Sequence, residues 1–102
     1  MIRIKRIYDE YEATDGYRIL VDRLWPRGIS KDKAHVDEWV KEIAPSSELR
    51  QWFNHQPERF AAFKSKYKQE LKENAELLAA IKKRAKQQQV TLLYGAKDEV
   101  HN

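Results

Sequence analysis

The chain has 102 residues, a mass of 12.2 kDa and a formal net charge of +4, which leaves room for one domain with one hydrophobic core. Hydrophobic residues make up 41% of it and cysteine is absent, so the composition argues against disorder and excludes disulfides, thiolate metal sites and a cysteine nucleophile. Residues 1–6 lack the apolar core of a signal peptide, and no apolar run approaches the roughly 20 residues that span a bilayer, which predicts a cytoplasmic protein without a membrane partner.

Two strands are predicted in the first quarter of the chain. Residues 2–7 alternate isoleucine with basic side chains, as a half-buried strand does, and a polar, turn-rich segment follows over residues 9–16. Residues 17–22 form the second predicted strand, because three consecutive apolar residues indicate burial on both faces of a sheet. Residues 23–35 contain a proline, a glycine and a serine and are predicted to be irregular. Loops of this length in a small domain are often functional.

The middle of the chain is predicted to be helical. A short helix is expected within residues 36–43, and a second one begins at an N-cap supplied by Ser46 or Ser47. Apolar side chains then recur at a helical period through residues 57–88, starting with Phe60, Phe63, Tyr67 and Leu71 on the buried side. One helix of that length would be about 48 Å long. We therefore expect a break near residues 72–74, with the asparagine at 74 capping the next helix.

Residues 90–94 form the last predicted strand, since they are β-branched at the start and nearly all apolar. The order strand, strand, helices, strand predicts an α/β fold. We expect a single small domain over residues 1–102, with a short, partly parallel sheet of about three strands covered by about four helices. In such sheets, ligands bind outside the carboxyl ends of parallel strands.

Charged residues follow two of the predicted strands. Asp22 and Arg23 follow the second strand, and Lys97 and Asp98 follow the last. If the two strands are parallel neighbours, these four residues meet at one edge of the sheet, with Arg27 reaching in from the loop above. The cationic side chains would bind a phosphate or a carboxylate. Asp22 would act as a general base or orient an arginine, and the supporting residues are expected to be Tyr8, Tyr17, Trp25 and Arg50.

The same residues also fit a purely structural charge network. In that interpretation Asp22 pairs with an arginine, Asp98 caps a following helix and Trp25 packs as a lid. The pattern does not decide whether the protein is an enzyme, with Asp22 as the one catalytic candidate, and it indicates no cofactor. The three histidines lack the spacing of metal ligands, so no metal site is predicted.

The positive charge is concentrated in residues 57–89, which hold nine basic residues against four glutamates. This pattern fits a nucleic-acid or protein interaction module on the lysine-rich helices 57–88. It also fits a solvated helix face that keeps a small protein soluble. We favour the second interpretation, because the excess is lysine and no aromatic residue is interleaved with the cluster at 82–86. The sequence does not determine the oligomeric state.

Residues 15–28 read DGYRILVDRLWPRG. This segment closely resembles the hallmark of the YeaO-like bacterial proteins, a domain-of-unknown-function family. Further matches extend over essentially the whole chain, at residues 39, 44–46, 48–50, 52–53, 63, 67, 70–71, 91–94 and 96–98. The resemblance implies a small cytoplasmic α/β protein, and it supplies no activity, cofactor or partner.

The resemblance also has a departure. Members of the family usually continue beyond the segment equivalent to Lys97 and Asp98 with a last amphipathic helix, whereas this sequence stops at Asn102. We therefore expect the domain to lack a final C-terminal helix. An apolar patch should then be exposed on the strand at residues 90–94.

Overall fold

The computed structural model describes residues 1–95, so Lys97 and Asp98 lie outside the described part of the chain. Within residues 1–95 four strands form one sheet in the order β1-β4-β2-β3. The strands are β1 (Ile2–Arg6), β2 (Tyr17–Leu20), β3 (Glu38–Trp39) and β4 (Val90–Tyr94). The helices are α1 (Lys31–Ala34), α2 (Ser47–Phe53), α3 (Phe60–Glu73) and α4 (Ala75–Gln87). The predicted α/β class is confirmed, with one more strand than expected.

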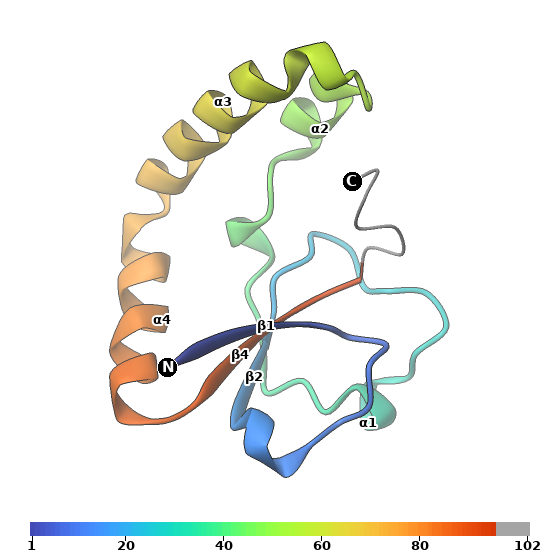
Figure 1. The fold of residues 1–102 in the computed structure, drawn as a ribbon, viewed down its shortest axis with the longest axis vertical. Helices are drawn as coiled ribbons and strands as arrows, with labels where there is room; N and C mark the ends of the chain where they lie inside the picture. The colour runs from blue at the N-terminus through green and yellow to red at the C-terminus, as the bar shows by residue number, and fades with distance from the viewer. Residues whose placement is uncertain (96–102) are drawn as a thin grey trace.

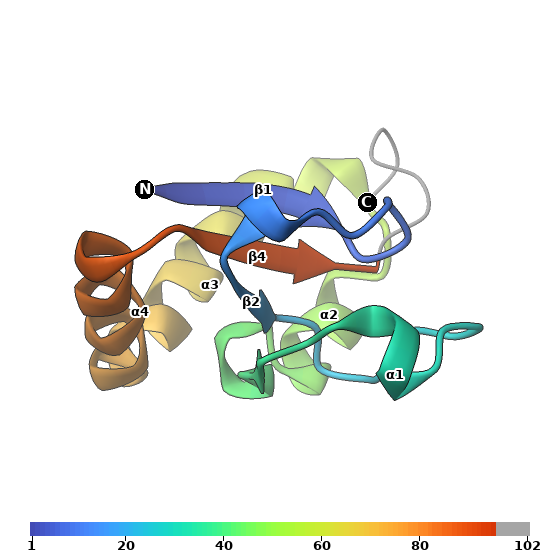
Figure 2. The ribbon, with the colours of Figure 1, turned by 90° about the horizontal axis from the view of Figure 1, so that it is seen from below.

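The pairings between the strands are parallel, and β4 lies between β1 and β2. Its register places Leu92 beside Ile19 of β2 and beside Ile4 of β1. In Figure 2 the arrowheads of β1 and β4 point in the same direction. β2 and β4 are therefore parallel neighbours, which is the arrangement that the predicted site requires, and their carboxyl ends lie at one edge of the sheet.

Each face of the sheet has its own apolar cluster. On one face Ile19 and Val90 pack with Ile81 of α4, and on the other face Leu20 and Leu93 are fully buried. The second face is covered by the loop after β2 and by α1, which contribute Trp25, Ile29, Ala34 and Val36. The alternation of Ile19 and Leu20 between two covered faces explains why this strand is a continuous apolar run.

A buried ion pair lies beneath the loop on that second face. Arg18 in β2 is 1% exposed and pairs with Asp15, which is 0% exposed. Its Nε and Nη2 donate to the carbonyls of His35 and Ala34, each at 3.0 Å, so Arg18 satisfies the carboxyl end of α1. Lys5 of β1 adds a second cation, with its Nζ 3.1 Å from Asp15 Oδ2. Sequence reasoning placed Arg18 in an apolar strand and did not anticipate this network.

The region around residues 36–43 differs from the prediction. The expected helix is reduced to a 3-10 turn at Lys41–Ile43, and β3 precedes it. Pairing with β2 determines this conformation, because the Asp37 and Val40 amides donate to the carbonyls of Arg18 and Leu20 at 2.9 Å. Backbone groups used in the sheet are not available for a helix. The predicted irregular stretch at 23–35 likewise contains the short helix α1.

The long helical region breaks where the sequence predicted. Helix α3 ends and α4 begins on either side of Asn74, and the two form a bent arch along one side of the molecule (Figure 1). The Asn74 side chain donates to the carbonyl of Glu42 at 3.0 Å and does not cap α4. Ser46 caps α2 by accepting from the Leu49 amide at 3.1 Å. Among residues 1–95, no helix is long and apolar enough to cross a membrane.

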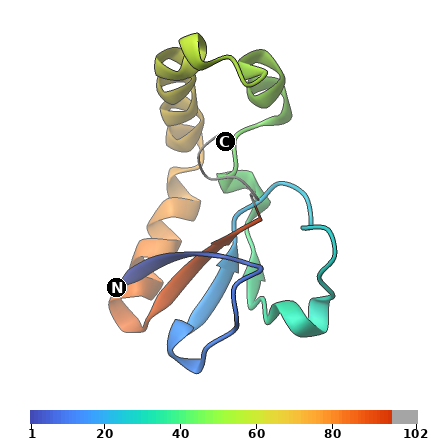
Figure 3. The same ribbon diagram turned by 45° about the vertical axis from the view of Figure 1, so that its right-hand side comes forward.

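Helices α2 and α3 form a hairpin that extends away from the sheet (Figure 3). We call residues 47–73 the α2–α3 hairpin. Helix α3 has no buried residue, and Phe60, expected on its buried side, is 48% exposed. Leu71, near the end of α3, packs against the apolar cluster around Ile19 and Val90, and no residue of the hairpin belongs to the buried clusters themselves.

The expected exposed patch lies on β1 and not on β4. Val90 and Leu93 of β4 are 0% exposed, whereas Ile4 of β1 is 75% exposed and Ile2 is 42% exposed. The reason is the position of β1 at the edge of the sheet, where its side chains have a neighbouring strand on one side only.

Candidate functional site

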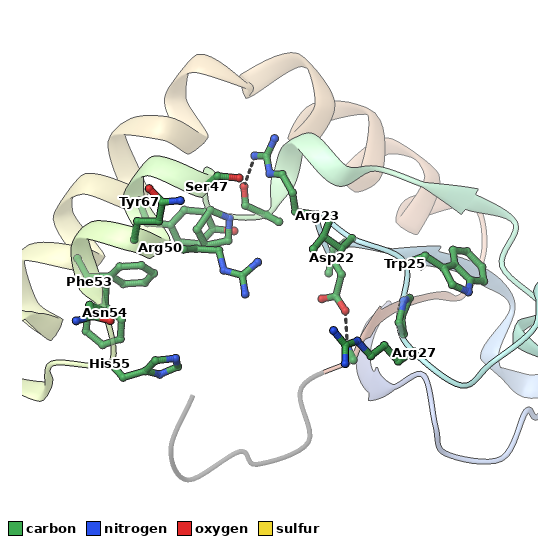
Figure 4. A pocket seen from close by; sticks show the side chains of 18 of the residues that line it. Asp22, Arg23, Trp25, Arg27, Ser47, Arg50, Phe53, Asn54, His55 and Tyr67 are labelled. Atoms are coloured by element: carbon green, nitrogen blue, oxygen red, sulfur yellow. Dashed lines mark hydrogen bonds between the residues drawn. The ribbon is translucent and has the colours of Figure 1, made fainter.

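A cleft of about 870 Å³ opens at the carboxyl edge of the sheet. We call it the strand-end cleft. One side consists of residues 21–27, which follow β2, and the other side consists of the α2–α3 hairpin (Figure 4). Gly95, directly after β4, completes the lining. The volume falls within the range of small-molecule sites in proteins.

Asp22 and Gly95 join the two strand ends. The Gly95 amide donates to Asp22 Oδ2 at 2.6 Å. A Cβ atom at position 95 would lie 2.8 Å from that oxygen and 3.2 Å from the Cβ of Pro26. A side chain at position 95 would therefore displace Asp22 or Pro26. The structure brings together the ends of the two strands that the sequence selected.

The carboxylate of Asp22 has an unusual environment. Burial raises its pKa above the ordinary value, although the Gly95 amide and the charge of Arg50 act in the opposite direction. Asp22 forms no ion pair within residues 1–95, and its Oδ1 accepts no hydrogen bond from them. Within residues 1–95, Asp22 therefore has no arginine at ion-pair distance, although the charge of Arg50 acts on it.

Two arginines face the cleft from opposite sides. Arg27 belongs to the loop after β2, and Arg50 lies on α2, where Figure 4 shows its side chain directed toward Asp22. Both residues are exposed, and neither guanidinium group forms an ion pair or hydrogen bond within residues 1–95. Their donors are available to an anion.

Arg23 also lines the cleft, but part of its guanidinium group holds the fold together. Its Nη2 donates to the carbonyl of Ala44 at 2.8 Å, and its Nε is buried without a partner among the described residues. Tyr67 makes a similar bond from α3, since its hydroxyl donates to the carbonyl of Ile43. Burial and the neighbouring charge of Glu70 raise the pKa of this hydroxyl, which keeps it protonated as a donor. Both contacts attach the segment before α2 to the walls of the cleft.

The hairpin side of the cleft is an aromatic wall. The rings of Phe53 and Phe63 have centroids 4.7 Å apart, and those of Phe63 and Tyr67 are 6.2 Å apart. Phe60 lies 6.4 Å from Phe63 with the two rings nearly parallel. Sequence reasoning assigned these residues to a buried helix face. Their helical spacing was a correct signal for a shared face, but that face lines a cleft.

Helix α2 ends with two consecutive residues in the left-handed region, Asn54 at φ 46° and His55 at φ 53°. Non-glycine residues seldom adopt this conformation, and Asn is among those that tolerate it best. The turn directs the His55 ring toward the cleft (Figure 4), where it lies 6.5 Å from the ring of Phe53. His55 was not among the predicted site residues.

Of the remaining predicted residues, Tyr8 and Trp25 line the cleft and also support the fold around it. The hydroxyl of Tyr8 donates to the carbonyl of Arg27 at 2.8 Å, which supports the loop. Trp25 Nε1 donates to the carbonyl of Ile29 at 2.8 Å, and its ring packs against the core. Tyr17 does not line the cleft, since its ring lies under the Arg84 guanidinium group at 3.9 Å. Lys97 and Asp98 remain predictions because they lie outside residues 1–95.

Acidic and histidine side chains do not assemble a metal site in the part of the chain that the structure describes. The strand-end cleft instead contains three arginines against one carboxylate. Its chemistry is therefore that of a cationic pocket with an aromatic wall, which suits an anion.

This fold and site define a small α/β protein with a cationic cleft at its strand ends. The chain belongs to the family described as the inactive DUF488-N3 subclade, whose model matches residues 1–102. The uncharacterized protein YeaO of Escherichia coli is 48% identical over 101 residues, which cover 99% of this chain and 88% of the relative. The resemblance to YeaO-like proteins is thereby confirmed.

Two mycobacterial relatives are similar over a shorter region. The uncharacterized proteins Rv3073c of Mycobacterium tuberculosis and Mb3100c of Mycobacterium bovis are each 51% identical over 76 residues, which are 74% of this chain. The match spans 64% of the length of these relatives. No solved structure matches the chain.

Proposed function

We propose that the protein binds a small anionic ligand, a phosphate or a carboxylate, in the strand-end cleft. The observation that carries this proposal is the pair of guanidinium groups of Arg27 and Arg50, which face one cavity without a carboxylate partner in residues 1–95. The carboxyl edge of a parallel sheet is where α/β proteins bind ligands. Arginine presents several donors in a planar group that matches an oxyanion.

Ligand binding alone is better supported than catalysis in the strand-end cleft. The family is described as an inactive subclade. Among residues 1–95, Asp22 is the one carboxylate that lines the cleft, and the Gly95 amide already donates to one of its oxygens. A general base needs a substrate proton within hydrogen-bond reach, and the free oxygen of Asp22 serves equally well to orient a ligand.

Calorimetric titration with inorganic phosphate and with acetate at low ionic strength tests the proposal. The matched variants are Arg50→Gln and Arg3→Gln, since Arg3 is exposed on β1 and does not line the cleft. We expect Arg50→Gln to weaken binding about tenfold or more, because a hydrogen bond to a charged group contributes about 1.5–3 kcal/mol. Arg3→Gln should bind as the unmodified chain does. Equal loss in both variants, or no heat from either anion, would contradict the proposal.

A second function is favoured by one separate observation. On the surface of the α2–α3 hairpin, Arg59 and Lys66 lie over the exposed ring of Trp52, which does not line the cleft, and Lys64 lies over Phe60. Basic and aromatic side chains are thus interleaved on this surface, as in proteins that bind single-stranded nucleic acid. A mobility-shift experiment with DNA and RNA at two salt concentrations tests it. Absence of binding at the lower concentration eliminates this function, because phosphate contacts are strongest there.

A further inference from the structure

The strand-end cleft has two chemically different sides. Arg27 and Arg50 supply positive charge, whereas Phe53, Phe60 and Phe63 supply a continuous apolar surface. An inorganic ion would satisfy the arginines and leave the aromatic wall in contact with water. The wall therefore requires a ligand with an apolar part of its own.

From this arrangement we infer that the ligand is an aromatic organic anion, a ring that bears a phosphate or a carboxylate, and this inference rests on the proposed function. The ring packs on the aromatic wall while the anionic group meets the arginines. Aromatic pairs prefer offset or tilted contacts with centroids about 4.5–7 Å apart. The rings of the wall already adopt such spacings with one another, from 4.7 Å to 6.4 Å.

The spacing of Arg50 and Phe53 on α2 limits the distance between the ring and the anionic group of the ligand. Arg50 and Phe53 are three residues apart on one helix and both line the cleft. Side chains at this spacing are neighbours on a helix surface. Figure 4 shows both on the cleft side of α2. A ring with its anionic group directly attached therefore reaches both residues at once, and a long flexible linker between them is unnecessary.

Asp22 supplies a reason why a bare anion is the weaker ligand. Its carboxylate faces Arg50 closely enough for the two charges to interact, so part of the field of Arg50 is already neutralised. An anion entering the cleft also meets repulsion from Asp22. Contact between the aromatic wall and the ring of the ligand compensates for this weaker electrostatic attraction. The affinity of the cleft for an anion therefore depends on whether the anion carries a ring.

A titration series on the intact chain tests the inference with three probes. These are phenyl phosphate, glycerol 1-phosphate and inorganic phosphate, which share the anion and differ in the body attached to it. We expect phenyl phosphate to bind about tenfold more tightly than either of the others, since an aromatic contact adds to the area it buries. Equal affinity for all three overturns the aromatic inference and leaves the proposed function standing. Absence of binding by all three, and by acetate in the calorimetric titration, overturns the proposed function itself.

Variants of the wall separate ring packing from general stability. Phe63→Leu keeps an apolar side chain and removes the ring, and it should weaken phenyl phosphate about fivefold while leaving inorganic phosphate unchanged. Tyr11→Leu is the matched control, because Tyr11 is 45% exposed and does not line the cleft. If Phe63→Leu fails to fold, Phe60→Leu replaces it, since Phe60 is 48% exposed and adds little to the core. Unchanged discrimination between the probes in the folded wall variant would overturn the inference.

Discussion

Replacing Asp15 with alanine tests the most consequential interaction in the fold. Asp15 is 0% exposed and accepts from Arg18, from Lys5 and from the Glu12 amide. Burial alone would raise the pKa of Asp15, but these three donors outweigh it and hold the pKa below its ordinary value. Removal of the carboxylate leaves the guanidinium group of Arg18 buried without a counterion.

The magnitude follows from that uncompensated charge. Removal of one partner of a buried ion pair costs about 3–5 kcal/mol. A domain of this size has a free energy of unfolding of about 5–15 kcal/mol, so Asp15→Ala should remove a large fraction of it. Each kcal/mol corresponds to roughly 4–8 °C in the midpoint of thermal unfolding for a small domain.

Urea unfolding followed by circular dichroism measures this change. Glu12→Ala is the matched control, because Glu12 pairs with the same Lys5 but its side chain is 62% exposed, and exposed pairs contribute about 0–1 kcal/mol. The pH dependence supplies a second readout. Since the folded pKa of Asp15 is depressed, its contribution is complete above the unfolded value near 3.8 and is lost as the pH falls toward the folded value. A decrease of less than 1 kcal/mol in the free energy of unfolding of Asp15→Ala would refute the stabilising role of the buried ion pair.

Three further predictions concern the cleft and its attachment. Gly95→Ala should lower the free energy of unfolding by about 1–3 kcal/mol, because the new methyl group would lie 2.8 Å from the Asp22 carboxylate. Urea unfolding measures this change, and an unchanged stability would contradict the prediction. Since the folded pKa of Asp22 is raised, stability should fall as the pH rises from 3.8 through the folded value. Asp22→Asn should abolish that slope in urea unfolding, and persistence of the slope would assign it to another group. Ser46→Ala should lower the free energy of unfolding by about 1–2 kcal/mol in urea unfolding, since Ser46 caps α2 and donates to Glu70. Ser47→Ala removes no cap and should lower it by less than half as much.

Local sequence patterns predicted those elements whose conformation depends on residues close to them in the chain. The strand at 90–94, the cap at Ser46 and the break at Asn74 each follow from side chains within one or two turns. The parallel pairing of β2 and β4 also followed, because a helical connection between two strands favours it. These elements alone predict that Asp22 lies at the carboxyl edge of the sheet.

Tertiary contacts determined what the sequence did not predict. β3 exists because the chain around Asp37 pairs with β2, and no local pattern marks that partner. Arg18 is buried because Asp15, Ala34 and His35 surround it, whereas a charged residue in a strand ordinarily indicates a solvent-facing position. Neither pairing leaves a periodic signal along the chain.

The aromatic wall illustrates a different limit. A stripe of apolar residues at helical spacing predicts a common face, but it does not distinguish a packed core from the side of a cavity. Phe60 and Phe63 line the strand-end cleft. The size of the domain indicates that some aromatic side chains lie outside the core, since a chain of 102 residues has little interior in which to bury eleven of them fully.

The α2–α3 hairpin has a consequence for motion. Tyr67 donates to Ile43 and Glu70 accepts from Ser46, so both bonds join α3 to the segment before α2. Leu71 packs against the core at the end of α3, but α3 has no buried residue. Regions with few buried apolar contacts open at lower free energy than the rest of a protein. Amide hydrogens of α3 should therefore exchange with solvent while those of β4 stay protected. The strand-end cleft thus combines a rigid floor with a compliant wall, and an occupant that touches both would slow the exchange of the whole hairpin.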